Sequence, residues 1–128
     1  MATIILSIHK PHCEALFARK KYYEFRKSLP KRPVTSILVY EAKGCGKIIG
    51  ELTVAETLVD SPENIWEMTK DKAGVDKDSF FTYFKNKDRA VAFVVEEAIR
   101  YEEPVALAHF GVSSPPQNYI WIEEKLME

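Results

Sequence analysis

Short apolar runs, several with polar residues at alternate positions, recur along the chain and predict five or six β-strands. A period of two places successive side chains on opposite faces of a sheet, and β-branched and aromatic residues favour that geometry. Gly50 lies inside the longest early run, where it indicates a bulge. The predicted strands are residues 3–8, 22–26, 36–42, 47–58, 89–101 and 118–123, and Pro104 is expected to end the fifth.

Three other segments carry helical signals. Pro11 suits the first turn of a helix over residues 11–20, and Ser61 followed by Pro62 marks the start of a second helix that ends at Gly74. Asp76 or Asp78 is expected to cap a third. The side chains expected to face inward are Cys13, Leu16 and Phe17, then Ile65, Trp66, Met68 and Thr69, then Phe80, Phe81 and Phe84.

The order of these elements indicates an α+β fold. Most strands follow one another without an intervening helix, which argues against a doubly wound parallel sheet. We therefore expect five to six mixed strands in a twisted or closed β structure with helices at its rim. The chain shows no linker or internal repeat, so residues 1–128 are interpreted as one domain.

The composition excludes several classes of protein. The 128 residues are 46% hydrophobic and 29% charged with a net charge of −1, which is typical of a globular protein and not of one that coats nucleic acid. No apolar run approaches the ~20 residues of a membrane helix, and the start lacks the basic region of a signal peptide. We therefore expect a cytoplasmic protein without a membrane partner, in which Cys13 and Cys45 are free thiols.

Positive charge is concentrated in the first part of the chain. Residues 10–47 contain ten Lys or Arg and only three acids, Glu14, Glu24 and Glu41. This asymmetry indicates a localised positive face, although a solvated surface is an equally good interpretation.

The most informative segment is residues 19–26, Arg-Lys-Lys-Tyr-Tyr-Glu-Phe-Arg. In an extended strand, Tyr22, Glu24 and Arg26 share one face, and Lys21 lies on the other with Tyr23 and Phe25. A cation on each face means that at least one charge points toward covered surface or into a cleft. Burying a charge is costly unless it is paired or used. The pattern predicts a polar site where a helix meets a strand; the alternative is an ion-pair cluster that only holds the two elements together.

A second cluster invites a metal interpretation. His9, His12 and Cys13 carry side chains that bind zinc. Only three candidate ligands occur together, and a strand, turn and helix do not direct them to one point. We therefore predict no metal and no cofactor, and the chain contains no P-loop or dinucleotide fingerprint.

Four motifs, in order along nearly the whole chain, resemble the ASCH domain family. Lys21-x-x-Glu24-x-Arg26 is similar to its Gly-x-Lys-x-x-Glu-x-Arg signature, with Arg19 in place of the glycine. The other three motifs are Ser7-Ile-His-Lys-Pro, Gly46-Lys-Ile-Ile-Gly-Glu51 and Pro115-Pro-Gln-Asn-Tyr119. If the glycine position needs a positive φ, arginine costs about 1 kcal/mol there. Either the turn differs, or Arg19 adds a cation at the cleft mouth.

The resemblance implies a PUA-like β-barrel, a fold shared with RNA-binding modules, and a cleft beside the barrel. Lys21 and Glu24 are the candidate catalytic pair if the cleft supports catalysis. Aromatic residues can stack on bases, and Arg and Lys contact phosphates or base edges. The residues that we expect to bind a ligand are Lys10, Arg19, Lys21, Tyr22, Glu24, Arg26, Gln117 and Tyr119.

Two functions remain open at this point. The first is binding of RNA or a modified nucleoside without turnover. The second is an enzyme, because one branch of the family hydrolyses N4-acetylcytidine with a lysine, a threonine three positions later and a glutamate. Lys21 matches that lysine, but Glu24 occupies the threonine position, and residues 71–76 offer no clear glutamate. Ribonuclease activity and protein interaction are weaker alternatives.

Overall fold

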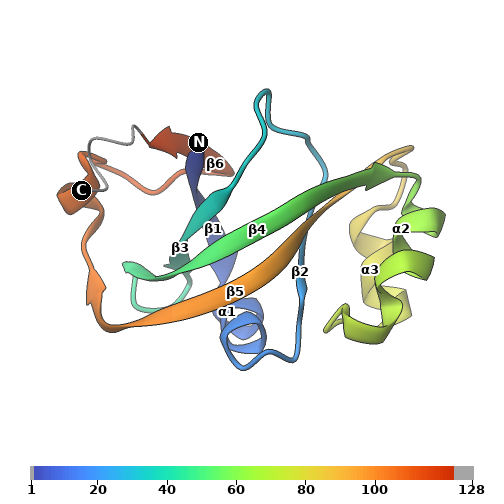
Figure 1. Ribbon diagram of the computed structural model, residues 1–128, viewed down its shortest axis with the longest axis horizontal. Coiled ribbons are helices and arrows are strands. Elements are labelled where there is room, and N and C mark those ends of the chain that lie inside the picture. The colour runs from blue at the N-terminus through green and yellow to red at the C-terminus, as the bar shows by residue number, and fades with distance from the viewer. Residues whose placement is uncertain (1, 123–128) are drawn as a thin grey trace.

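The computed structural model describes residues 2–122, and a six-stranded mixed sheet is its main feature (Figure 1). The strands are β1 (Thr3–His9), β2 (Tyr23–Arg26), β3 (Ser36–Ala42), β4 (Ile48–Asp60), β5 (Ala90–Val105) and β6 (Tyr119–Ile122). They lie in the order β2-β5-β4-β3-β1-β6. Only β1 and β3 pair in parallel, and the other four pairs are antiparallel.

Three helices lie at the rim of this curled half-barrel. α1 (Lys10–Phe17) follows β1, while α2 (Pro62–Thr69) and α3 (Lys77–Tyr83) form a pair between β4 and β5. Two short 3₁₀ turns, η1 (Lys70–Lys72) and η2 (Leu107–Phe110), complete the described elements. The predicted α+β class with mixed strands and peripheral helices is confirmed. Among residues 2–122, no helix has both the length and the hydropathy to cross a membrane.

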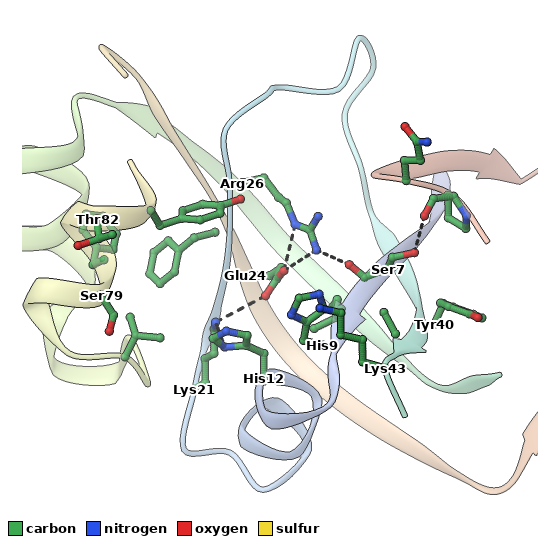
Figure 2. Close-up of a pocket in the computed structure, with 18 of the residues that line it drawn as sticks. Ser7, His9, His12, Lys21, Glu24, Arg26, Tyr40, Lys43, Ser79 and Thr82 are labelled. Carbon is green, nitrogen blue, oxygen red and sulfur yellow. Dashed lines mark hydrogen bonds and ion pairs between the residues drawn. The ribbon is translucent and has the colours of Figure 1, made fainter. Parts of the chain in front are cut away.

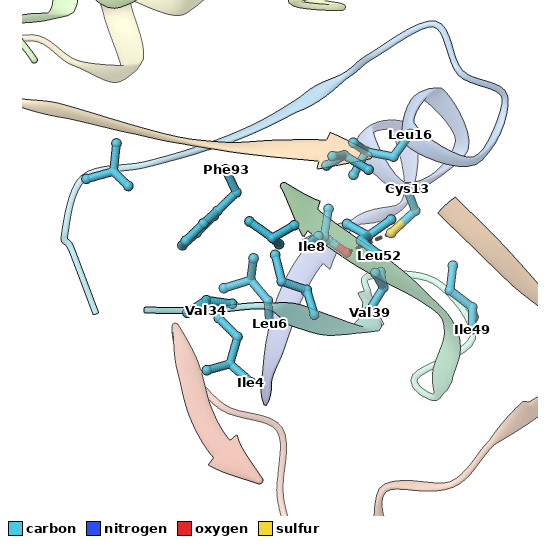
Figure 3. Close-up of a cluster of buried hydrophobic side chains, with 14 residues drawn as sticks. Ile4, Leu6, Ile8, Cys13, Leu16, Val34, Val39, Ile49, Leu52 and Phe93 are labelled. Atoms are coloured by element: carbon cyan, nitrogen blue, oxygen red, sulfur yellow. Dashed lines mark hydrogen bonds between the residues drawn. The ribbon is translucent and has the colours of Figure 1, made fainter. Parts of the chain in front are cut away.

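The first part of β5, residues 90–95, is covered on both faces because it separates two apolar clusters. Val91, Phe93 and Val95 alternate toward the main core, where Leu6 and Leu16 also pack (Figure 3). Ala90 and Ala92 belong to a second cluster, which also contains Phe25 of β2, Ile65 of α2 and Phe80 of α3. Removing a buried phenylalanine side chain such as Phe93 typically costs about 3–5 kcal/mol of stability, so this core fixes the sheet on which the site is built.

The bulge predicted near Gly50 is confirmed. The pairing of β4 with both β3 and β5 shifts register between Ile48 and Gly50. A Cβ at Gly50 would lie 2.7 Å from the Phe17 ring and would also meet the Ile99 carbonyl oxygen. Glycine is required because α1 packs directly against the sheet backbone at this point.

The first helix ends three residues earlier than predicted. It ends at Phe17 with Ala18 as C-cap, and Arg19 follows with φ of 57°. A left-handed residue after the C-cap ends a helix, and glycine is the residue that usually takes this conformation. The signature position therefore does need a positive φ. Arg19 donates hydrogen bonds from Nη2 to the carbonyl oxygens of Val95 (3.0 Å) and Glu96 (3.4 Å), which offset part of its strain.

Four smaller predictions were wrong. Pro104 does not end β5, which continues to Val105, because the proline lies in an irregular stretch between the pairs Gly50–Arg100 and Ile48–Val105. There its missing N–H costs no ladder hydrogen bond.

Met68 is 50% exposed, since Ile65 and Thr69 define the buried side of the short α2. The second strand begins at Tyr23, and the last begins at Tyr119; Glu123 lies outside the described residues.

Candidate functional site

An open cavity of about 940 Å³ lies between the sheet and α3. Its residues come from β1, α1, β2 and the residue Lys21 before it, the end of β3 with Lys43, α3 with Val75 before it, and residues 115–117. Figure 2 shows Lys21, His12, Glu24 and Arg26 together on one side of the cavity, with Ser79 and Thr82 across from them on α3. The cavity thus joins segments that are far apart in the sequence.

The Glu24 carboxylate and the Arg26 guanidinium form a buried ion pair. Arg26 donates from Nε (3.0 Å) and Nη2 (2.9 Å) to the same oxygen, Oε2 of Glu24. The Glu24 side chain is 6% exposed, and that of Arg26 is 16% exposed. The pair lies on one face of β2, as the predicted alternation requires.

Arg26 also connects β2 to the other side of the half-barrel. Its Nη2 donates to the Ser7 carbonyl oxygen of β1 (2.7 Å), and its Nη1 donates to Oδ1 of Asn118 (3.2 Å), just before β6. Four of the five guanidinium N–H groups are therefore used within the protein. Ser7 completes the bridge by donating from Oγ to the Pro116 carbonyl oxygen (2.7 Å).

Lys21 contributes an ammonium group that is almost fully covered, with 3% of its side chain exposed. Its Nζ lies 3.1 Å from Nδ1 of His12 and 3.7 Å from Oε1 of Glu24. Burial lowers the pKa of Lys21; the Glu24 charge opposes this shift, and Arg26 adds to it. The prediction that Lys21 and Glu24 occupy opposite faces was wrong, because Lys21 precedes β2 and is not bound by the strand alternation.

A glycine fixes the backbone next to Lys21. Gly74 has a φ of +69°, and a Cβ there would lie 2.5 Å from Cβ of Lys21. The backbone N–H of Tyr22 donates to the carbonyl oxygen of Lys72 (2.9 Å), so the segment between α2 and α3 lies directly against the Lys21 segment. The helical pair thereby covers the lysine.

His12 and Cys13 separate instead of forming a metal site. His12 lines the cavity, and its pKa is lowered by burial and then by the charge of Lys21. Cys13 faces the main core, donates from Sγ to the Ile8 carbonyl oxygen (3.3 Å) and has its pKa raised to about 12 by burial. Within residues 2–122, no three His, Cys, Asp or Glu side chains are grouped to hold a metal ion.

The predicted ligand-binding residues divide into two groups. Lys21, Glu24, Arg26 and Gln117 line the cavity. The other four are outside its lining: Lys10 is exposed at the start of α1, Arg19 and Tyr22 contact each other, and Tyr119 packs on Trp121 in β6.

The Tyr22 ring is already in contact with two cations. The Arg19 guanidinium carbon lies 4.2 Å from the ring centroid, and the Lys72 ammonium lies 5.5 Å from it. Arg19 therefore contacts Tyr22 and the backbone of β5, and it is not among the residues that line the cavity.

Sequence reasoning missed Ser7, His12 and the wall formed by α3. The polar residues Asp78, Ser79 and Thr82 line the cavity from that helix. Their helical spacing was available as a signal, because polar residues opposite Phe80 and Phe84 define a second face of α3. The sequence suggested only a metal-binding role for His12. Residues that are adjacent on a helix, such as His12 and Cys13, point about 100° apart and cannot easily bind the same metal ion.

Comparisons with known proteins agree with this architecture. A family model of the ASCH domain matches residues 6–105. A crystal structure of the ASCH protein from Zymomonas mobilis superposes with a TM-score of 0.87 and 19% identity, covering 98% of this chain and 90% of that one. The fold and its cavity thus define a PUA-like domain. The chain belongs to the ASCH domain family, whose PUA-like fold is associated with RNA binding.

Two proteins of Ureaplasma parvum serovar 3 each contain a segment similar to 94% of this chain. One is ATP synthase subunit alpha, with 27% identity, and the other is the large ribosomal subunit protein uL22, with 25% identity. The chain spans only 15% of the length of the first protein and 39% of the second.

Proposed function

We propose that the cavity binds a nucleobase, either in a free nucleoside or in RNA. The observation that carries this proposal is the buried cluster of Lys21, Glu24 and Arg26 at one side of a cavity of about 940 Å³. Cavities of about 300–1,000 Å³ commonly accommodate small ligands. A cluster of one carboxylate and two cations, held by protein contacts, is suited to recognise polar groups in a fixed arrangement.

The walls of the cavity support the same proposal. Phe25, Phe80 and Tyr83 supply aromatic surface to the lining, and Gln117 supplies an amide. Aromatic surface favours the flat face of a base, whereas amide and carboxylate groups read its edge. The net charge of −1 fits a small specific ligand better than extended nucleic acid.

The comparisons are compatible with RNA as the source of the base, because the PUA-like fold is associated with RNA binding. The two relatives differ in their named roles, one in a ribosome and one in an ATP synthase, so they do not favour a particular ligand.

A second candidate function is hydrolysis of an acylated nucleoside. The lowered pKa of Lys21 favours it, because a neutral amine can take a proton from a water molecule that adds to an acyl carbon. The departing amine of the base would then need a proton from an acid. The Lys21 ammonium formed in the first step can return that proton, and Asp78 is a further carboxyl group on the cavity wall.

The two functions are tested with a panel of plain and acetylated nucleosides and short RNAs. Retention and products are followed for the wild type, for Lys21→Ala and for Lys20→Ala, which is a matched control because Lys20 is the exposed neighbour. We expect Lys21→Ala to reduce retention about tenfold or more, since it removes a charged group from the buried cluster. Lys20→Ala should behave as the wild type.

Turnover of an acetylated nucleoside that Lys21→Ala abolishes would replace the binding function with the hydrolase. Retention of no member of the panel by the wild type would contradict both functions. Urea unfolding of each variant separates a lost ligand contact from a lost fold.

A further inference from the structure

His12 has one ring nitrogen occupied and one free. Its Nδ1 lies 3.1 Å from Nζ of Lys21. Its Nε2 makes no hydrogen bond within residues 2–122, and it is not among the buried side-chain atoms that lack a partner, which are Arg19 Nη1 and Glu41 Oε2. Because His12 lines the cavity, the free nitrogen is accessible from it.

The contact with Lys21 decides which nitrogen carries the proton. An ammonium group has three donors and no acceptor, so the nitrogen that faces it must offer a lone pair. A neutral imidazole with a lone pair on Nδ1 carries its hydrogen on Nε2. The lowered pKa of His12 is consistent with the neutral ring at pH 7.

We propose that His12 is a hydrogen-bond donor to the ligand of the cavity and that Lys21 is a positioning residue that holds it in the Nε2–H tautomer. This inference rests on the proposed function, since it specifies how the same cavity reads a base. It assigns His12 a role that the Lys-x-x-Glu-x-Arg motif does not include.

The donor has an acceptor close by. Oε1 of Glu24 lies 3.7 Å from Nζ of Lys21, on the side of the carboxylate that Arg26 does not use. Lys21 thus contacts both the His12 ring and the carboxylate oxygen that Arg26 does not bind. A ligand that contacts both groups must offer an acceptor to the His12 N–H and a donor to the Glu24 oxygen. A nucleobase edge carries both kinds of group, whereas a phosphate offers acceptors alone.

The tautomer can be measured without any ligand. Long-range ¹H–¹⁵N NMR of the ¹⁵N-labelled chain at pH 7.5 distinguishes protonated from unprotonated ring nitrogens, and the chain has only three histidines to assign. His12→Gln identifies the His12 signals. We expect an unprotonated Nδ1 and a protonated Nε2 in the wild type. A proton on Nδ1 would overturn the inference, whatever the cavity binds.

The donor role is measured with the four unmodified ribonucleosides as probes. We expect His12→Phe, which has no ring N–H, to weaken binding about tenfold, the usual effect of one lost hydrogen bond. His12→Gln retains an amide N–H on a chain of similar reach and should recover part of the affinity. His109→Gln is the control, because His109 is exposed in η2 and outside the cavity lining.

The outcomes separate this inference from the proposed function. If the wild type binds a nucleoside and His12→Phe binds it equally well, the donor role is wrong and the proposed function stands. If the wild type binds neither a nucleoside nor an RNA, the proposed function is wrong, and the donor role is wrong with it. The tautomer measurement remains independent of both results.

Discussion

The buried ammonium of Lys21 depends on a residue without a side chain. Gly74 lies against Cβ of Lys21 and has a φ of +69°, so it combines a close contact with a backbone conformation that other residues rarely adopt. The neighbouring backbone atoms of Lys21 cannot move away as the end of a flexible side chain would. At the scale of single residues, the site therefore requires both the charged group and the space beside it.

We expect Gly74→Ala to be clearly more destabilising than Gly46→Ala. Both positions have positive φ, but a Cβ at Gly46 would meet only Oη of Tyr40 at 3.5 Å, an ordinary contact. The left-handed backbone should cost about 1–2 kcal/mol at each position. The overlap with Lys21 should add about 1–3 kcal/mol at Gly74. Urea unfolding of both variants measures the difference, and equal losses would show that the Lys21 contact is unimportant.

Sequence reasoning identified three of the central residues but not their geometry. Lys21, Glu24 and Arg26 were recognisable because charges on both faces of a predicted strand are unusual. Their arrangement was not, because Lys21 precedes β2 and contacts Glu24 instead of pointing away from it. His12 could not be recognised as a partner of Lys21, because that contact depends on how α1 meets β2.

At the scale of elements, the position of α3 depends on its first residue. Asp76 is the N-cap, and its Oδ1 accepts a hydrogen bond from the backbone N–H of Ser79 (2.7 Å). This bond is the main cause of the lowered pKa of Asp76. The helix has only seven residues, so one cap influences a large part of it, and Ser79 also belongs to the cavity wall.

We expect Asp76→Ala to loosen α3 and Asp76→Asn to preserve it, since asparagine is an equally good N-cap. Amide hydrogen exchange in α3 should be about fivefold faster in Asp76→Ala.

Because the pKa of Asp76 is lowered by folding, the stabilisation by its charge is present above pH 3.8 and is lost as the pH falls through the folded-state pKa. The stability difference between wild type and Asp76→Asn should therefore shrink in that range; a constant difference would contradict this.

The periodicity of the sequence predicts most of the strands and helices. It predicts less well which residues of a short helix are buried. β5 followed from the alternation of Val91, Phe93 and Val95. The exposure of Met68 did not follow, because an eight-residue helix buries only a narrow stripe and the second cluster selects which residues form it.

At the scale of the whole molecule, the half-barrel is closed by side chains and not by a backbone ladder. β2 and β6 are the two edge strands of the sheet. Arg26 of β2 donates to the Ser7 carbonyl oxygen of β1 and to Asn118, which directly precedes β6, while its ion pair with Glu24 holds the guanidinium in place. The Asn118 amide also donates from Nδ2 to Oγ of Ser28 (3.2 Å). The motif that was expected to bind a ligand therefore also closes the barrel.

We expect Arg26→Met to cost about 3 kcal/mol of stability, because it leaves the Glu24 carboxylate buried without its closest cation. The estimate is at the low end of the usual range because Lys21 remains 3.7 Å from Glu24. The double variant Glu24→Gln/Arg26→Met should lose less than the sum of the two single variants, by about 1 kcal/mol or more. Denaturation of all four proteins measures this coupling, and strict additivity would contradict the closure by this pair.

The closure by Arg26 has a consequence for association between molecules. A short edge strand such as β2, which pairs with β5 on one side, keeps the peptide groups of its other side available, and such an edge can accept an extended segment from another polypeptide. The hydrogen bond from Arg26 to the Ser7 carbonyl oxygen ties β2 to β1 of the same molecule. Weakening that bridge would release the edge, and dimers or larger aggregates joined strand to strand would be the form in which the loss became visible.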